Sequence, residues 1–120
     1  MKRTYCKVTL EKHGIQIPVT ALLDTGNFLV EPISGKPVSV LEETYLAGYL
    51  PESEWEDGFR LIPYRSVGRR HGLMRGLIFD RMEVRRGRKC ACVREPVIGL
   101  VRGILGGEKG YQMLLNMKML

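Results

Sequence analysis

A single aspartate, Asp24, most constrains what this chain can fold into and do. It ends the apolar run Ala21–Leu23 and stands directly before Thr25 and Gly26. An apolar run followed by a Thr-Gly pair predicts a strand that ends in a tight turn. An aspartate at that point can be nested in backbone amides and exposed at the floor of a cleft. Taken alone it could also be an ordinary turn residue, because aspartate suits turns.

The length and composition indicate a single compact domain over residues 1–120. The 120 residues are 44% apolar, which is enough for one hydrophobic core and leaves no room for a second lobe of similar size. The longest apolar runs are too short to span a bilayer, and no secretory segment follows the basic start. We therefore expect a soluble, cytoplasmic chain.

The cysteines and histidines predict neither disulfides nor a metal site. Cys6, Cys90 and Cys92 are odd in number, and the spacing of the last two fits neither a redox motif nor a zinc knuckle. We interpret all three as reduced thiols in a reducing compartment. His13 and His71 lie far apart, with no cysteine at ligand spacing, so no metal is expected.

The net charge of +6 is unevenly distributed along the chain. Acidic residues gather at 52–57, and basic residues gather from Arg60 to Arg94. The basic stretch is either a solvated face or a surface that attracts an acidic protein segment, an anionic leaflet or phosphates. Aromatic residues are few there and show no stacking pattern, so we expect no nucleic-acid partner.

The residue pattern predicts a mostly β chain. His13 and Gly14 mark a hairpin turn, and Pro18 marks an edge or a bulge in the second strand. The predicted strands are Tyr5–Lys12, Ile15–Leu23, Phe28–Val30, Val38–Leu41, Phe59–Val67, Gly72–Val84 and Cys90–Arg94.

Two short helices and an apolar end complete the predicted elements. Glu42–Tyr49 has a helical pattern that Pro51 ends, and Leu100–Leu105 is a candidate for a second short helix. Tyr111–Leu115 is an apolar segment with little to pack on in so small a domain, so we expect it to supply area at a subunit interface.

Three features follow one another in an order that is typical of single-lobed, retroviral-type aspartic peptidases. The strand that ends at Asp24 comes first, and a glycine-flanked hairpin at Tyr64–Met74, in the position of a flap, comes second. The third is an apolar residue followed by glycine, Ile98 and Gly99, which we expect to pass beneath the active-site loop. Such enzymes need two aspartates of this kind, whose carboxylates share one proton, and this chain contains one Asp-Thr-Gly segment.

Four segments carry a closer resemblance. Ala21–Asn27, Ile62–Gly68, Pro96–Val101 and Tyr111–Leu115 resemble the soluble peptidase domain of the sporulation sigma-E factor-processing peptidases, in the right order and over nearly the whole chain. In that family several transmembrane helices precede this domain. We therefore expect either an excised catalytic domain or an unanchored relative, with any membrane attachment made through a region missing here.

The resemblance implies an all-β, retropepsin-like closed barrel with a flap hairpin and one or two short helices. It implies a homodimeric aspartic endopeptidase that removes the N-terminal pro-segment from an inactive sigma-factor precursor. It places this work at the cytoplasmic face of the sporulation septum membrane, on the mother-cell side, under an activator protein from the forespore. It implies no cofactor.

The resemblance also assigns roles to individual residues. Asp24 from each of two chains would form the catalytic pair, and Thr25, Gly26 and Asn27 would complete its turn. The remaining assignments are the flap residues Arg65, Ser66, Val67 and Gly68, and Ile98 and Gly99 as the structural element below the site. Arg65 remains open between a contact to substrate and a strand-edge charge that prevents aggregation.

Two alternatives remain open. One is a non-catalytic, peptide-binding module of the same fold, which a strictly monomeric state would favour. The other is a basic β-domain that binds nucleic acid, which salt-dependent binding to random duplex would favour.

Overall fold

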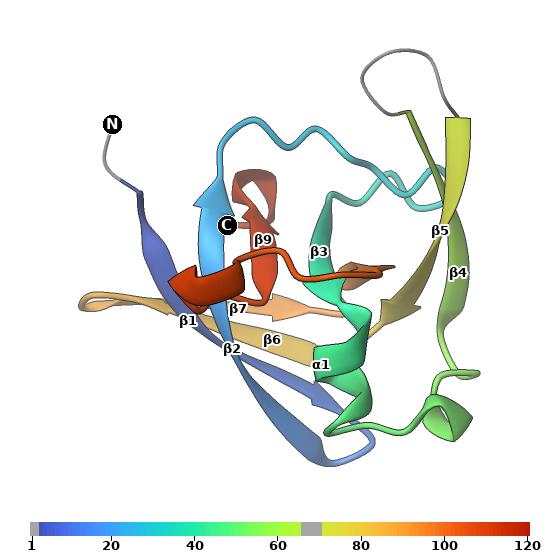
Figure 1. The fold of residues 1–120 in the computed structure, drawn as a ribbon, viewed down its shortest axis with the longest axis horizontal. Coiled ribbons are helices and arrows are strands. Elements are labelled where there is room, and N and C mark those ends of the chain that lie inside the picture. The colour runs from blue at the N-terminus through green and yellow to red at the C-terminus, as the bar shows by residue number, and fades with distance from the viewer. Residues whose placement is uncertain (1–2, 66–70) are drawn as a thin grey trace.

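The computed structural model describes residues 3–65 and 71–120 (Figure 1). The strands are β1 (Tyr5–Lys12), β2 (Ile15–Asp24), β3 (Val38–Glu42), β4 (Phe59–Arg65), β5 (His71–Ile78), β6 (Arg81–Arg86), β7 (Lys89–Arg94), β8 (Val97–Val101) and β9 (Met113–Asn116). The helix is α1 (Glu43–Ala47), and the 3₁₀ turns are η1 (Glu52–Glu54), η2 (Gly107–Lys109) and η3 (Met117–Met119).

The strands form one open sheet in the order β4-β5-β8-β3-β9-β2-β1-β6-β7. The mostly β prediction is confirmed, but the closed barrel was wrong, because β4 and β7 stand at opposite edges and do not pair. Both carry features of edge strands. Pro63 in β4 has no backbone N–H to donate, and β7 carries the exposed charges of Lys89 and Arg94.

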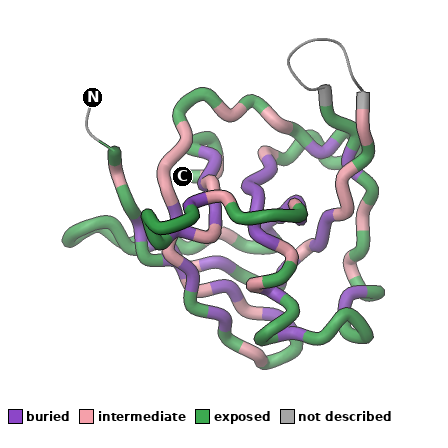
Figure 2. The backbone as a smooth tube through the Cα atoms, viewed as in Figure 1, coloured by how far each residue is buried: buried purple, intermediate pink, exposed green. Residues whose placement is uncertain are grey.

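The first hairpin forms as predicted. β1 pairs with β2 in an antiparallel register from Tyr5↔Leu22 to Lys12↔Ile15. Buried residues alternate along both strands, as the tube in Figure 2 shows, so that one face meets the core and the other meets solvent. Pro18 lies in the part of β2 that has β1 on one side only, since β9 pairs with β2 from Ala21 onward.

The long strand expected over Gly72–Val84 is divided in two. β5 ends at Ile78 and β6 begins at Arg81. Between them Asp80 N donates to Glu11 O, at 2.8 Å. The break lets the chain leave β8, the partner of β5, and join β1, the partner of β6.

The helix expected over Glu42–Tyr49 forms as α1, whereas the one expected over Leu100–Leu105 does not. Leu100 continues β8, paired with Leu41 of β3 and with Arg75 of β5. Gly103 then adopts φ +93°, a left-handed backbone conformation outside the α-helical region.

The segment Tyr111–Leu115, expected at a subunit interface, lies inside the sheet instead. Its strand β9 runs parallel to β2 and antiparallel to β3, and Figure 1 shows it between them. Met113 and Leu115 are fully buried. The prediction was wrong because it overlooked a parallel pairing with a strand about 90 residues away, which no local pattern reveals.

Two hydrophobic clusters support the sheet. The larger joins residues of β1, β2, β6 and β9 to Leu46 of α1 and to Trp55, whose ring N–H donates to Leu50 O at 3.0 Å. The smaller consists of Val38, Ile62 and Val97, with Leu29 and Met74 among the residues packed on it. It fixes β3, β4 and β8 as one wall near the end of β2.

In the part of the chain that the structure describes, no helix has the length and apolar character needed to cross a membrane.

Candidate active site

Asp24 is the last residue of β2, directly before a turn, as predicted. Its Oδ1 accepts a hydrogen bond from Gly26 N at 3.1 Å, and its backbone oxygen accepts one from Asn27 N at 3.4 Å. The side chain is half-buried. The carboxylate is therefore fixed by its own turn and still open to solvent on one side.

The turn residues differ in what they contact. Thr25 and Gly26 are exposed. Asn27 donates from Nδ2 to Val38 O at 3.1 Å and accepts at Oδ1 from Leu29 N at 2.9 Å. Asn27 thus ties the loop to the first residue of β3.

A cavity of about 600 Å³ lies beside Asp24. Residues 26–30 of the loop line one side of it, and Val40, Pro63, Tyr64 and Met74 line the other. Phe28 reaches into solvent with 70% of its surface exposed, and Lys118 Nζ lies 4.7 Å from the centre of its ring. The lining is mostly apolar, which suits side chains of an extended peptide.

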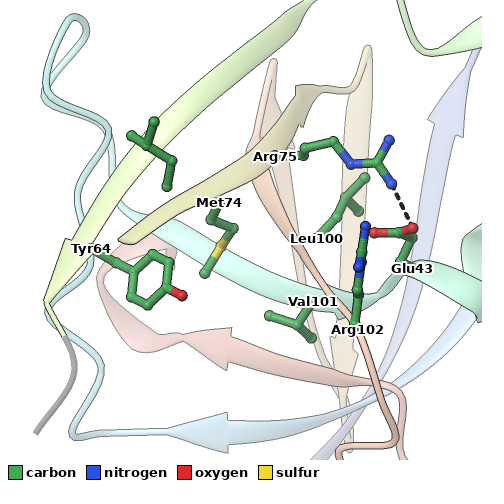
Figure 3. Close-up of a pocket in the computed structure, with 8 residues that line it drawn as sticks. Glu43, Tyr64, Met74, Arg75, Leu100, Val101 and Arg102 are labelled. Carbon is green, nitrogen blue, oxygen red and sulfur yellow. Dashed lines mark ion pairs between the residues drawn. The ribbon is translucent and has the colours of Figure 1, made fainter. Parts of the chain in front are cut away.

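A second cavity, of about 500 Å³, shares Tyr64 and Met74 with the first. Figure 3 shows these two side chains at one end and the Arg75–Glu43 ion pair, at 2.5 Å, at the other. The hydrogen bond that Arg75 donates to the Glu43 carboxylate raises the pKa of Arg75 above its ordinary value. Together the two cavities extend from Asp24 along β5 to the start of α1.

The hairpin expected to act as a flap is described only in its strands. β4 and β5 pair from Phe59↔Leu77 to Arg65↔His71. Ser66, Val67 and Gly68, assigned to the flap tip, lie outside the described residues. Pro63, Tyr64 and Met74, which line the cavity beside Asp24, were not among the residues assigned from the sequence.

Ile98 and Gly99 do not lie next to the strand that carries Asp24. They belong to β8, which pairs with β3 and β5, and two strands separate β8 from β2. Gly99 is needed for packing, because a Cβ there would lie 2.3 Å from Met74 Sδ. Gly99 therefore supports Met74, a residue of the cavity wall, from behind, whereas Ile98 packs in the larger hydrophobic cluster.

The strand beside Asp24 is β9, and sequence reasoning missed its last residue, Asn116. The register aligns Leu22, Leu23 and Asp24 of β2 with Leu114, Leu115 and Asn116 of β9. The repeated pattern of two leucines followed by a short polar residue was the only available signal.

The cysteines lie away from the cavity lining and carry no metal cluster. Among residues 3–65 and 71–120, no group of three or more histidine, cysteine or acidic side chains could hold an ion. Cys6 is buried, and this burial raises the pKa of its thiol, although the charge of Arg86 opposes the shift. Cys90 and Cys92 are exposed on β7.

Comparison with models of protein families shows which family the chain belongs to. The family model of peptidase family U4, described as sporulation factor SpoIIGA, matches residues 1–119. The chain belongs to this peptidase family. The resemblance found in the sequence is thereby confirmed at the level of the family.

Three relatives of the SpoIIGA family illustrate the match. A protein of Priestia megaterium named sporulation sigma-E factor-processing peptidase is 26% identical over 87% of this chain. A protein of Clostridium acetobutylicum named probable sporulation sigma-E factor-processing peptidase is 30% identical over 82%. A sporulation sigma factor-processing peptidase by name, from Bacillus thuringiensis subsp. kurstaki, is 26% identical over 95%. The matched region is 40%, 35% and 83% of the three relatives' lengths, respectively. No solved structure matches the chain.

Proposed function

We propose that this protein is an aspartic endopeptidase that processes a sigma-factor precursor, with Asp24 as its catalytic residue. The observation that supports this proposal is the position of Asp24, which Gly26 N holds in a turn at the end of a strand and which lines a largely apolar cavity. The names of the relatives, all sporulation sigma-factor-processing peptidases, support the substrate.

The proposed mechanism needs two copies of the chain. One chain supplies one Asp-Thr-Gly turn, whereas acid–base hydrolysis of a peptide by carboxylates uses a pair. In the proposed homodimer the two Asp24 carboxylates face each other across the two-fold axis. Carboxylates a few ångströms apart cannot both be ionised, so the pair retains one proton near neutral pH.

Each member of the pair then has a separate task. The ionised carboxylate takes a proton from a bound water, which attacks the scissile carbonyl carbon. The protonated carboxylate donates to the carbonyl oxygen and stabilises the charge that develops there. Thr25, which is exposed beside Asp24, would hydrogen-bond across the dimer and hold the two turns together.

The substrate lies extended in the groove. Residues 26–30 and the β4–β5 hairpin form its two sides, and the hairpin closes over the peptide to exclude water. The proposed cut removes an N-terminal pro-segment from the sigma-factor precursor. Residues 1–120 act as one peptidase domain in this proposal, at the cytoplasmic face of the septum membrane and with an activator protein.

The test compares wild type with Asp24→Asn on a sigma-E precursor, with cleavage followed by gel electrophoresis and mass spectrometry. Asparagine keeps the size of the side chain and its acceptor for Gly26 N, and it removes the shared proton. We expect processing to fall by at least about a thousandfold. Thermal unfolding should change little, because Asp24 makes no buried ion pair among the described residues.

The control is Asp80→Asn, since Asp80 is exposed and lines neither cavity next to Tyr64. It should cleave like wild type. An Asp24→Asn protein that still processes the precursor would contradict the proposal. Binding of the precursor by a strict monomer, without cleavage, would instead support the peptide-binding module.

A further inference from the structure

The polar residue beside Asp24 is completely buried. Asn116 ends β9, aligned with Asp24 across the parallel β2–β9 pair, and its side chain has no exposed surface. A buried carboxamide must satisfy two donors and an acceptor, so its partners indicate what it holds in place.

The side-chain amide of Asn116 donates to two oxygens of the segment that leads from Asp24 to β3. Its Nδ2 donates to Leu29 O at 3.3 Å and to Val38 O at 3.2 Å. Its Oδ1 accepts from Lys118 N at 3.0 Å. Its backbone N donates to Ser39 Oγ at 2.8 Å. The side-chain amide, the side-chain oxygen and the backbone N–H of Asn116 therefore each have a hydrogen-bond partner.

Asn116 consequently spans the active-site loop from end to end. Its backbone lies beside the start of the loop at Asp24, and its side chain holds Leu29 within the loop and Val38 where the loop ends. Asn27, near the start of the loop, donates to the same Val38 O that Asn116 uses. Two carboxamides from opposite ends of the chain therefore meet at one carbonyl of β3.

Neither aspartate nor alanine at position 116 could make the hydrogen bonds that the Asn116 side chain makes. Aspartate would lose both donors and turn a charge toward the oxygens of Leu29 and Val38. Alanine would leave the Leu29 oxygen with Val38 N, at 2.9 Å, as its remaining partner. The loop would stay attached to β3 and would lose its link to the strand beside Asp24.

We infer that Asn116 is a positioning residue for Asp24, which fixes the active-site turn relative to β3 and β9. This role rests on the proposed function, because it matters for catalysis only if Asp24 reacts. Its side chain has no exposed surface, so it acts through the residues that it holds in place. In a symmetric pair, a displacement of the turn toward or away from the two-fold axis occurs in both chains, so the separation of the two carboxylates changes by twice that displacement.

The inference predicts a specific kinetic effect of Asn116→Ala. The apolar cavity that binds substrate remains, so KM should stay within about twofold of wild type, while kcat falls about tenfold to a hundredfold because the reacting groups are displaced. The separation of the carboxylates also sets how strongly they share the proton, so the pH profile of kcat should narrow or shift.

The matched control is Leu115→Val, in the same strand and equally buried, which removes packing without touching the network. Both variants are assayed on a sigma-E precursor at a temperature where each is folded. Leu115→Val should keep the wild-type kcat. The milder Ser39→Ala removes the acceptor for the backbone of Asn116, and it should lower kcat about threefold even if Asn116→Ala fails to fold.

A second readout does not depend on activity. Hydrogen exchange of the Leu29 amide, which donates to Asn27 Oδ1, should become at least about tenfold faster in Asn116→Ala. The amides of β1 and β6 should exchange as in wild type.

The outcomes separate the two proposals. Wild-type kcat and unchanged Leu29 exchange in Asn116→Ala, or an equal loss of kcat in Leu115→Val, would overturn the positioning role. A cleaving Asp24→Asn protein in the same assay would overturn the proposed function instead.

Discussion

At the scale of single residues, the loop between Asp24 and β3 is held by short-range hydrogen bonds to buried polar side chains. Glu31 is almost fully buried and accepts from Ser34 Oγ at 2.7 Å and from Ile33 N at 2.8 Å. The bond from Ser34 is the main reason that the pKa of Glu31 lies below its ordinary value. The hydrogen bonds of Glu31 thus hold the second half of the loop in place, and those of Asn27 hold the first half.

Gly99→Ala tests how the wall of the cavity is packed. The added Cβ would lie 2.3 Å from Met74 Sδ, so the end of the Met74 side chain must move toward the cavity that it lines. We expect KM for a sigma-factor precursor to rise about tenfold with little change in kcat, since lost space in a pocket acts on binding. Steady-state kinetics on the precursor measure this.

The control for this prediction is the double variant Gly99→Ala/Met74→Ala, which restores the space. Its KM should return toward the value of Met74→Ala alone. An unchanged KM in Gly99→Ala would show that Met74 relaxes away from the cavity.

At the scale of elements, one tyrosine of α1 adds a hydrogen bond to the packing of Leu46 and the Glu43–Arg75 ion pair that hold this helix against the sheet. The hydroxyl of Tyr45 donates to Pro18 O, in the part of β2 that β9 does not cover. The same hydroxyl lies 3.5 Å from the hydroxyl of Tyr49. Burial, followed by the hydrogen bond with Tyr49, raises the pKa of Tyr45 to about 12.

This pKa predicts an alkaline loss of stability. Between about pH 10, the ordinary value, and about pH 12, the unfolded chain releases the Tyr45 proton and the folded chain keeps it. The unfolded state then binds fewer protons, so the free energy of unfolding decreases as the pH rises. In Tyr45→Phe this decrease should be smaller, and stability at pH 8 should be lower by about 1 kcal/mol for the lost hydrogen bond. Urea unfolding at pH 8 and across pH 10–11.5 measures both, and parallel pH curves for the two proteins would contradict the assignment.

The sequence predicted elements whose signals are local. The alternation in Tyr5–Lys12 and the His13-Gly14 turn require only neighbouring residues, and β1 and the turn are where they were expected. The position of Asp24, at the end of a strand and before a turn, was also predicted from neighbouring residues, and its catalytic role stays a prediction. Asn116 was missed because its contacts to Leu29 and Val38 span 87 and 78 residues.

At the scale of the whole molecule, the nine strands form one open sheet, and Asp24 lies at the end of β2 in its interior. Each chain therefore carries one Asp-Thr-Gly turn. The prediction of a closed barrel failed because closure depends on whether the two edge strands accept each other. Pro63 on β4 and the charges on β7 disfavour that pairing, and these edges lie far apart in the sequence. In the proposed function, a second chain therefore supplies the second catalytic aspartate.

Mixing experiments test this dependence directly. If both Asp24 side chains are required, Asp24→Asn chains exchange into dimers with wild type and inactivate them. With wild type held constant and Asp24→Asn added in ninefold excess, processing should fall to about a tenth, the share of wild-type chains that find a wild-type partner in random pairing. Undiminished processing after full subunit exchange would mean that one Asp24 is sufficient.

The insertion of β9 between β2 and β3 has a consequence for how the protein is made. Translation delivers β2 and β3 early, but the strand that separates them leaves the ribosome only after residue 116 has been added. Until then β2 and β3 cannot take their final places on either side of β9. The loop that follows Asp24 also lacks the hydrogen bonds from Asn116 to Leu29 and Val38. In the proposed function, a nascent chain therefore cannot cleave peptides, and activity begins only after β9 has been inserted between β2 and β3.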